Sequence, residues 1–285
     1  MTLAQVTLTV PVAKRLIAAG VSRLPEVRLA LGSGKVWLKG GTTVSAVAEE
    51  LGLPPMRISG RITVNGTRCA RDDGGGAHHY VWTGAEWVVG DERLAELVSA
   101  FGPGDVVIVG ANAIDTHGHA AFLTGTSFGG NTGQLIHGVA AEGATVLVTA
   151  GLEKLVPGDL ASLIPATGRK KVNTAMGMGC GLMMLPGRIF TEVEAVEALA
   201  AVKPAVVARG GIRGAEGATT LLLKGDQAEV AKVLQLVASA QAKAAATPES
   251  GAPQSLVECS KPGPHCRTHT GCNCLLHLER QGGGA

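Results

Sequence analysis

Two continuous apolar runs with a helical segment between them constrain this fold more than any other feature. DVVIVG (Asp105–Gly110) and ATVLVTA (Ala144–Ala150) are short and rich in β-branched residues. Strands that are buried on both faces have this composition, as in a parallel sheet. NTGQLIHGVAAEG, which lies between them, predicts a helix. The three segments together predict the strand–helix–strand unit of α/β proteins.

The same alternation extends along most of the chain. We predict helices at Val10–Gly20, Pro25–Leu31, Asp91–Phe101, Glu192–Ala201 and Gln227–Ala246, and strands at Lys35–Lys39 and in HAAFLTG, PAVVARGG and ATTLLLKG. Asp91 is a favourable cap for the third of these helices. The predicted fold class is therefore α/β, with a mainly parallel or mixed sheet and helices on both faces.

A β-rich segment interrupts this frame between residues 57 and 90. RISGRITVNGTRCA (Arg57–Ala70) alternates in polarity and contains Asn65-Gly66, a dipeptide that favours a tight hairpin turn. HYVWTGAEWVV (His79–Val89) has a second hairpin pattern. We therefore predict one α/β ligand-binding domain over residues 1–246, with a small β-hairpin insertion at 57–90.

The composition argues against several functional classes. The formal net charge is only +2 and aromatic residues make up 3% of the chain, so a nucleic-acid-binding protein is not expected. No apolar run reaches the roughly 20 residues of a transmembrane helix. Lys14 and Arg15 interrupt the first apolar segment, unlike a secretory signal. The sequence therefore predicts a cytoplasmic protein that does not bind a membrane.

Glycine-containing loops follow three of the predicted strands. In open α/β sheets, ligands bind at the carboxyl ends of strands, where helix N-termini offer unpaired N–H groups to anions. The loops therefore predict a site for a small anion, whereas the alternative is a set of plain turns that cap the next helices. The predicted ligand-binding residues are Gly40, Gly41, Thr42, Thr43, Ser45, Asn112, Gly129, Gly130 and Asn131.

Parts of this frame resemble a known superfold. WLKGGTTVSAVAEEL is similar to the first strand–loop–helix of the ribose-phosphate isomerase and CoA-transferase superfold, in which such a loop holds a sugar phosphate. VIVGANAID resembles the Gly-Ala-Asp-x-x-Asp strand end of the isomerases. The block from GANAIDTHGHAAFLTG to ATVLVTAGLEKLVP resembles the LUD domain, a relative linked to lactate utilisation. The resemblance covers about Lys35–Pro157 and implies a site for a phosphorylated, CoA-type or carboxylate ligand.

The chain departs from the isomerase pattern at residues that would carry catalysis. Asn112 stands where the isomerases have their first carboxylate, whereas Asp115 matches the second. The Lys-Gly-Gly-Gly segment and the Glu base of that family have no clean counterparts, because GTSFGGNTGQ offers only the amides of Asn131 and Gln134. The resemblance therefore implies ligand binding, does not imply sugar-phosphate isomerisation, and leaves enzyme activity undecided.

The segment IDTHGH places Asp115, His117 and His119 at alternate positions. Alternate residues of an extended segment share one side, so these three can converge as metal ligands or as acid–base groups. Asp115 is therefore a candidate catalytic residue, and a polar loop with solvated histidines is the alternative. Lys154, in GLEKLVP, is either a partner for a phosphate or an ordinary surface lysine.

NTAMGMGCGLMMLPG (Asn173–Gly187) is rich in Gly and Met and contains Cys180. Such a segment is apolar and adaptable, which suits the wall of a ligand pocket. Cys180 is the second candidate catalytic residue, as a nucleophile that needs a lowered pKa and a nearby base. The alternative is a small buried thiol within a glycine-rich turn.

The end of the chain carries a dense group of metal-ligating side chains. After a linker over residues 247–257, the tail at 258–285 holds four of the six cysteines. Thiolates and imidazoles bind zinc, and four thiolates can hold an iron–sulfur cluster. Unliganded thiols and disulfides are the alternatives. The predicted metal ligands are Cys259, Cys266, Cys272 and Cys274.

These observations favour a protein that binds a small anionic metabolite at its strand-end loops, with transferase or isomerase-like activity as one form of this hypothesis. A non-enzymatic ligand sensor or assembly protein with a metal-binding tail is an alternative, because the catalytic carboxylates of the superfold are not recognisable. A redox-linked protein with an iron–sulfur tail is another. The expected partners are the anionic ligand and, through the tail, a second protein or a homo-oligomer.

Overall fold

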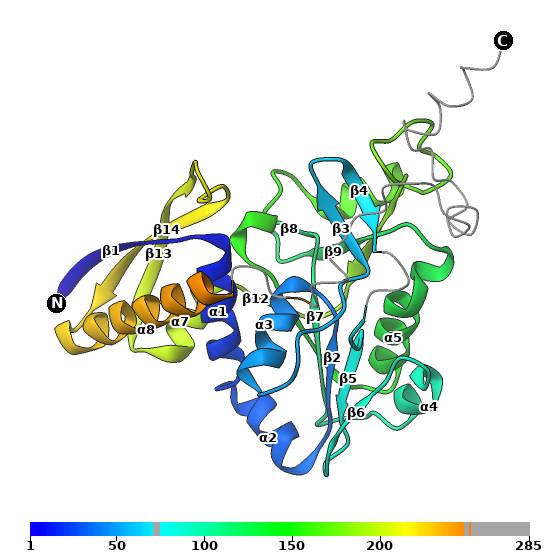
Figure 1. Ribbon diagram of the computed structural model, residues 1–285, viewed down its shortest axis with the longest axis horizontal. Helices are drawn as coiled ribbons and strands as arrows, with labels where there is room; N and C mark the ends of the chain where they lie inside the picture. Colours follow the sequence, from blue (N-terminus) through cyan, green and yellow to red (C-terminus); the bar gives the residue numbers. More distant parts are fainter. Residues whose placement is uncertain (71–74, 248–250, 252–285) are drawn as a thin grey trace.

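The structure is a computed structural model that describes residues 1–70, 75–247 and 251. Its centre is a six-stranded mixed sheet with the order β12-β10-β7-β2-β5-β6 (Figure 1). The first four strands are parallel to one another, whereas β5 and β6 form an antiparallel edge. These strands are β12 (Arg188–Phe190), β10 (Thr145–Thr149), β7 (Val106–Gly110), β2 (Val36–Lys39), β5 (His79–Trp82) and β6 (Trp87–Val89).

Helices cover both faces of this sheet, which confirms the predicted α/β class with a mixed sheet. Leu38 and Ile108 pack towards the helices of one face, and Trp37 and Val107 pack towards those of the other. Because successive strand residues point to opposite faces, a strand covered on both sides is apolar at every position. The first face carries α1 (Val10–Val21), α2 (Pro25–Ser33) and α3 (Thr42–Glu50), and the second carries α4 (Leu94–Ser99) and α5 (Gly130–Ala141).

A second, antiparallel sheet lies beside the first and has the order β1-β14-β13 (Figure 1). Its strands are β1 (Thr2–Leu8), β13 (Val202–Gly210) and β14 (Ala218–Gly225), and the helices beside it are α7 (Glu192–Leu199) and α8 (Gln227–Ala246). α7, α8 and one side of α1 cover one face of the sheet around Leu8, Leu221 and Leu223. The sequence predicted β13 and β14, but it predicted neither β1 nor the separation of these strands from the central sheet.

A third sheet stands above the carboxyl edge of the central one and has the order β11-β9-β8 (Figure 1). It consists of β8 (Ala113–Ile114), β9 (Ala120–Thr124) and β11 (Gly181–Leu185). The first predicted hairpin is present as a two-stranded sheet of β3 (Gly60–Thr63) and β4 (Gly66–Cys69). The second is present too, but it forms the β5–β6 edge of the central sheet. Short helices lie at η1 (Ser127–Gly129), η2 (Leu152–Lys154), α6 (Leu160–Leu163) and η3 (Ile164–Ala166).

Two helix starts differ from the sequence prediction. α3 begins at Thr42 and not at Ala46, because the Ser45 N–H already donates to the carbonyl of the capping residue Gly41 over 2.7 Å. The loop is therefore shorter than predicted. α4 begins at Leu94, three residues after the predicted Asp cap.

The carboxylate of Asp91 has another function. It accepts hydrogen bonds from the main-chain N–H groups of His78 and His79 over 3.0 and 3.2 Å. It also pairs with Arg57, whose guanidinium nitrogen lies 3.2 Å away. The predicted cap is wrong because this side chain joins β5 to the segment that precedes β3.

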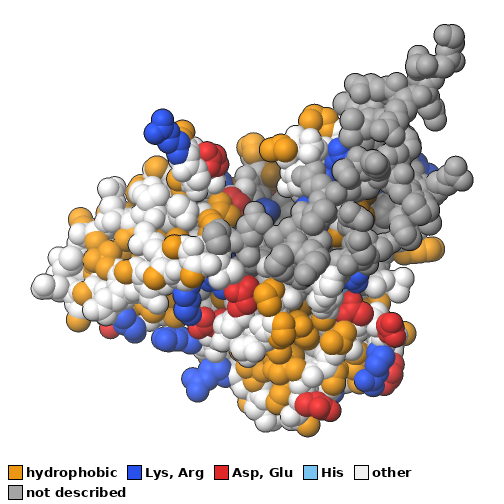
Figure 2. Space-filling model, viewed as in Figure 1, with side chains coloured by type: hydrophobic (Ala, Val, Ile, Leu, Met, Phe, Trp, Pro, Cys, Tyr) orange, Lys and Arg blue, Asp and Glu red, His pale blue; other side chains and the backbone are white. Residues whose placement is uncertain are grey.

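The surface and the end of the chain offer little evidence about function. Within the described ranges, no helix is long and apolar enough to cross a membrane. Basic and acidic side chains are interspersed on the face that Figure 2 shows, in keeping with the formal net charge of +2. The predicted tail, with Cys259, Cys266, Cys272 and Cys274, lies outside the described residues, and so does most of the linker before it.

Candidate functional site

The four parallel strands end side by side, so the loops that follow them share one edge of the central sheet. Gly40-Gly41 follows β2 and Gly110-Ala111-Asn112 follows β7, and these two strands are neighbours. A Cβ at Gly110 would lie 4.0 Å from Val44 of α3, so the first two predicted loops adjoin each other. Gly129-Gly130-Asn131 lies instead at the start of α5, which packs on the opposite face of the sheet.

The loop at Gly40 is closely packed. Its N–H donates to the His78 carbonyl over 2.7 Å. A Cβ at Gly40 would lie 2.4 Å from the Arg57 carbonyl oxygen and 2.7 Å from His78 Nδ1. Only a residue without a side chain fits this approach. The structure therefore explains this glycine by packing, and its predicted contact with a ligand stays a prediction.

The other predicted residues at this edge lie in α3 and at the end of β7. Thr42 and Thr43 open α3, and the Thr43 side chain is buried. The Ser45 hydroxyl is buried and has no hydrogen-bond partner in the described part of the chain. Asn112 Oδ1 accepts a hydrogen bond from a main-chain N–H of β9, that of Leu123, over 3.0 Å. Asn112 thus fixes β9 to the end of β7.

A buried group of basic side chains lies beside the Gly40 loop. Burial lowers the pKa of Lys39 to about 8 and that of His78 to about 3, and it holds the pKa of His79 well below its usual value. His79 Nδ1 accepts a hydrogen bond from Trp37 Nε1 over 3.0 Å, so the single ring proton of His79 lies on Nε2. Both histidines are therefore neutral at pH 7, and Lys39 is the cation nearest this loop.

A cavity of about 670 Å³ opens at the start of α5. Its walls come from the end of β9, the first turns of α5, the strand β11 and the loop 168–171. No acidic residue is among the described residues that line it. Its polar lining side chains include Thr126, Gln134, His137, Arg169, Lys170 and Lys171.

The chain enters α5 through three consecutive residues with positive φ: Phe128 at 57°, Gly129 at 72° and Gly130 at 60°. A non-glycine residue in this left-handed region costs about 1–2 kcal/mol. Phe128 is also 86% exposed, so burial of its ring does not offset that cost. Gly129 caps α5 without a side-chain hydrogen bond, and the Gly130 N–H donates to the Ser127 carbonyl. Gly129 and Gly133 line the cavity, so the start of α5 lies beside it.

The basic run Arg169–Lys171 lies across the cavity from this helix end. Arg169 donates to the hydroxyl of Ser127, 3.1 Å away, and so joins the run to the loop before α5. Lys171 Nζ donates to the Pro165 carbonyl over 2.5 Å, and Lys170 is exposed. Cationic side chains and a helix N-terminus both favour a bound anion. The cavity is therefore electrostatically suited to negative charge.

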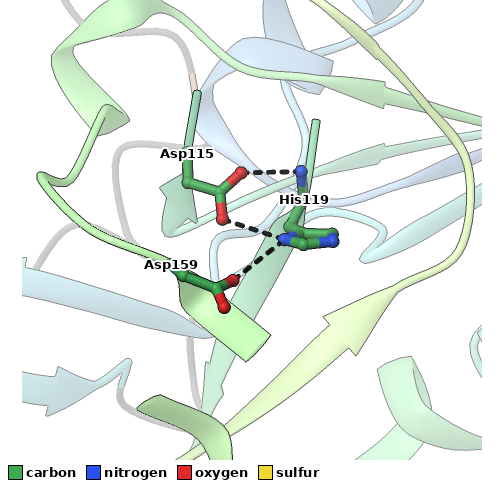
Figure 3. A group of neighbouring side chains, drawn as sticks. All are labelled: Asp115, His119 and Asp159. Atoms are coloured by element: carbon green, nitrogen blue, oxygen red, sulfur yellow. Dashed lines mark hydrogen bonds and ion pairs between the residues drawn. The ribbon is translucent and has the colours of Figure 1, made fainter. Parts of the chain in front are cut away.

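Asp115 lies in the turn between β8 and β9 with a fully buried side chain (Figure 3). Its Oδ1 accepts from the N–H groups of His117 and His119 over 2.9 and 2.8 Å, and its Oδ2 accepts from the Leu160 N–H over 2.9 Å. Burial alone would raise the pKa of this carboxyl. The three N–H groups and the His119 ring outweigh burial and hold its pKa well below the usual range. Asp115 is therefore ionised at neutral pH, and its catalytic role stays a prediction.

Two further side chains meet Asp115 in space. His119 Nδ1 lies 3.0 Å from Asp115 Oδ2 and 3.3 Å from Asp159 Oδ1 (Figure 3). His117 is more exposed, and its Nδ1 lies 3.9 Å from Asp115 Oδ2. The structure thus brings together Asp115 and His119, as the spacing of IDTHGH predicts. Asp159 was missed because it reaches this turn from the segment after β10, where it also caps α6.

The segment GLEKLVP forms η2 after β10. Lys154 is half-buried there and is not among the described residues that line the α5 cavity. The N–H of Leu152 donates to Glu192 Oε2 over 3.0 Å, and the Thr219 hydroxyl donates to Glu192 Oε1 over 2.8 Å. Burial raises the pKa of Glu192. This carboxylate therefore fastens the end of β10 to the second sheet, and the predicted phosphate contact of Lys154 stays a prediction.

The Met- and Gly-rich segment packs against the hairpin β3–β4. The Thr67 N–H donates to the Met176 carbonyl over 3.0 Å, and a Cβ at Gly177 would lie 2.0 Å from the Thr67 carbonyl oxygen. The segment also contributes Met183 to the cavity wall, as its composition predicts. Cys180 is half-buried with its Sγ 3.6 Å from the Met178 carbonyl, and its role as a nucleophile stays a prediction.

The cavity residues that sequence analysis missed have a weak local signal. GRKKV contains three consecutive basic residues, Arg169–Lys171, after a glycine, but nothing in the sequence places this run beside α5. Comparisons with known family models, with curated proteins and with solved structures found no match. The function must therefore be inferred from the sequence and the geometry of this chain.

Proposed function

We propose that this protein binds a small anionic metabolite in the cavity at the start of α5. The anion would contact the first N–H groups of the helix and the basic run Arg169–Lys171. One observation carries the proposal: three consecutive cations line the same cavity as Gly129 and Gly133 at the start of α5, and no described lining residue is acidic. Gly129, Gly130 and Asn131, which the sequence predicted as ligand-binding, begin this helix.

The two sources of positive charge have different roles. A helix N-terminus contributes about 0.3–1 kcal/mol to a nearby negative charge. Arginine offers a rigid pair of donors that matches a phosphate or a carboxylate, whereas a lysine acts as a mobile point charge. Arg169 is half-buried and already attached to the helix-entry loop through Ser127, so it is the best-placed donor. Lys170 and Lys171 would add attraction that salt can screen.

The size and apolar walls of the cavity indicate the ligand class. Its volume of about 670 Å³ falls within the range of small-molecule sites, about 300–1,000 Å³. Phe128 and Met183 line it alongside the cations, so an anionic group joined to an apolar part fits better than a bare ion. The resemblance of residues 35–157 to the isomerase and CoA-transferase superfold supports a phosphorylated or CoA-type ligand. The proposal concerns binding, because the described lining residues include neither a carboxylate nor a thiol.

Calorimetric titration of the full chain with coenzyme A tests this proposal. The variant Arg169→Gln/Lys170→Gln/Lys171→Gln should bind about tenfold more weakly, since exposed ion pairs contribute about 0.5 kcal/mol each. Added salt should reduce the difference between the variant and the wild type.

A matched control keeps the same change in charge. Lys203→Gln/Lys224→Gln/Lys232→Gln also removes three exposed cations, but these lie on the second sheet and α8. The control should bind coenzyme A as the wild type does. Equal losses in the two triple variants would mean that net charge and not the cavity attracts the ligand, and the proposal would fail. Undetectable binding to the wild type would exclude the CoA class.

A further inference from the structure

We propose that Asp115, His119 and Asp159 form a binding site for a divalent transition-metal ion, separate from the α5 cavity. Two of the ligands come from the β8–β9 turn, and the third comes from the start of α6, some 40 residues later in the chain. Figure 3 shows the three side chains pointing towards one another. A metal ion here would fasten the β8–β9 turn to α6.

The distances between the ligand atoms suit a metal ion. His119 Nδ1 is 3.0 Å from Asp115 Oδ2 and 3.3 Å from Asp159 Oδ1, and all three atoms lie within 4.8 Å of one another. Zinc binds nitrogen and oxygen at about 2.0–2.2 Å, which places adjacent ligand atoms about 3.0–3.5 Å apart. The side chain of Asp159 is 43% exposed. A small movement of this side chain would bring all three ligand atoms within bonding distance of one ion.

A single hydrogen on the His119 ring cannot pair with both carboxylates of this group. His119 Nδ1 can carry one hydrogen, yet it faces two carboxylate oxygens. Two N–H groups of the turn hold Asp115 Oδ1, and the Leu160 N–H of α6 uses one lone pair of Oδ2, so the other lone pair of Oδ2 remains for the centre of the group. Outer hydrogen bonds of this kind orient ligands in metal sites. A divalent cation would neutralise both carboxylates, whereas a neutral imidazole neutralises neither.

The site is closed on one side and open on the other. The Asp115 side chain is fully buried, while those of His119 and Asp159 are 36% and 43% exposed. Three protein ligands with an open face leave room for water or for a small ligand on the metal. His117 lies at this open face, 59% exposed, with its Nδ1 3.9 Å from Asp115 Oδ2, so it is within reach as a fourth ligand.

This site and the anion cavity lie at opposite ends of β9. His119 directly precedes the strand and Thr124 ends it at the cavity, so the two are about 17 Å apart along an extended chain. The proposal therefore does not depend on the anion site. One imidazole and two carboxylates favour Zn²⁺, Co²⁺ or Mn²⁺ over Mg²⁺, which prefers oxygen ligands and water.

The test uses Co²⁺ as a spectroscopic substitute for Zn²⁺. Cysteine thiolates in general bind transition metals. The parent protein is therefore the full chain with Cys259, Cys266, Cys272 and Cys274 replaced by Ser. This parent, prepared free of metal, should bind one Co²⁺ with visible d–d absorption and without the near-ultraviolet band of a cobalt–thiolate bond. Zn²⁺ should displace the Co²⁺, and Mg²⁺ in equal concentration should not.

Two variants in the same background remove ligands without removing the fold. Asp159→Asn keeps the cap of α6, since Asn caps a helix as well as Asp does. His119→Ala removes a partly exposed ring. Each should weaken Co²⁺ binding about tenfold or more, because one of three protein ligands is lost. Asp226→Asn and Gln241→Ala are the controls on exposed residues and should bind Co²⁺ as the parent does.

Circular dichroism of all four variants confirms that they are folded before the comparison is made. Binding of Co²⁺ that is equally tight in the ligand variants and in the controls would overturn the proposal. So would a folded parent that binds neither Co²⁺ nor Zn²⁺ at micromolar concentrations. Loss of binding in the ligand variants alone supports it.

Discussion

Mild acid should destabilise this protein through the buried histidines beside the Gly40 loop. His78 is 5% exposed and His79 is completely buried. His78 Nδ1 donates to the Arg57 carbonyl over 2.8 Å, and its Nε2 lies 3.4 Å from the Ser59 hydroxyl. Burial first, and then the charge of Lys39, lower the pKa of His78 from 6.5 to about 3. The folded state therefore holds this ring neutral at any pH above about 3.

The size of the effect follows from the two pKa values. Below pH 6.5 His78 binds a proton in the unfolded chain but not in the folded state, so stability is lost as the pH falls. Each such proton costs about 1.4 kcal/mol per pH unit, which gives about 2 kcal/mol for His78 between pH 7 and pH 5. His79 has a lowered pKa as well and adds a loss of the same sign. Carboxylates remain largely ionised in this window.

Urea unfolding at pH 7, 6 and 5, followed by circular dichroism, measures the loss. In His78→Asn the side-chain amide can still donate to the Arg57 carbonyl, but it cannot titrate. This variant should lose about 2 kcal/mol less than the wild type between pH 7 and pH 5. His137→Asn, at an exposed position, should keep the wild-type dependence. A wild type of constant stability over this range, or a His78→Asn variant with the full pH dependence, would refute the argument.

Three further substitutions test the packing and charge of the fold. Gly133→Ala should lower the midpoint of thermal unfolding, because a Cβ there would lie 2.2 Å from the Phe128 carbonyl oxygen. An unchanged midpoint would show that the loop before α5 can move without cost. Gly32→Ala is also in a helix, but no atom lies within 4 Å of the new Cβ. Its free energy of unfolding in urea should instead rise by up to about 1 kcal/mol, and a decrease would contradict the helical conformation at Gly32. Glu192→Gln should be more stable than the wild type at pH 7, because burial raises the pKa of Glu192 and its ionised form weakens the fold above that pKa. Lower stability of this variant in urea would mean that its hydrogen bonds need the charge.

Local sequence patterns predicted the central sheet because strands that are buried on both faces are apolar at successive positions. The runs VVIV in β7 and VLV in β10 are apolar at successive positions, and the two segments are adjacent parallel strands. β14 has a similar run, LLL, yet it pairs with β1 and β13 in a sheet of its own. Strand partners lie far apart in sequence, so composition identifies a strand without identifying its sheet.

The site residues likewise fall into two groups: those that a local sequence pattern predicted, and those that only tertiary packing brings together. Asp115 and His119 were predicted to share one side of an extended segment, whereas in the structure they meet because the segment is a turn between β8 and β9. Asp159 and Arg169 were not predicted, because each reaches its site from a distant segment through tertiary packing. Gly40 was predicted as a ligand contact because glycine suits both close packing and anion binding. Only the structure shows the carbonyl of Arg57 against it.

The most direct measurement of the anion site is an amide chemical-shift titration of the full chain with coenzyme A. We expect saturable shifts at Gly129, Gly130 and Gly133, which weaken with salt and in the Arg169→Gln/Lys170→Gln/Lys171→Gln variant. The Gly40 N–H donates to the His78 carbonyl and the Ser45 N–H donates to the Gly41 carbonyl, so the amides of this loop serve as the internal comparison. Unchanged amides at the start of α5, with shifts confined to the Gly40 loop or to the charged surface of the second sheet, would contradict the proposed function.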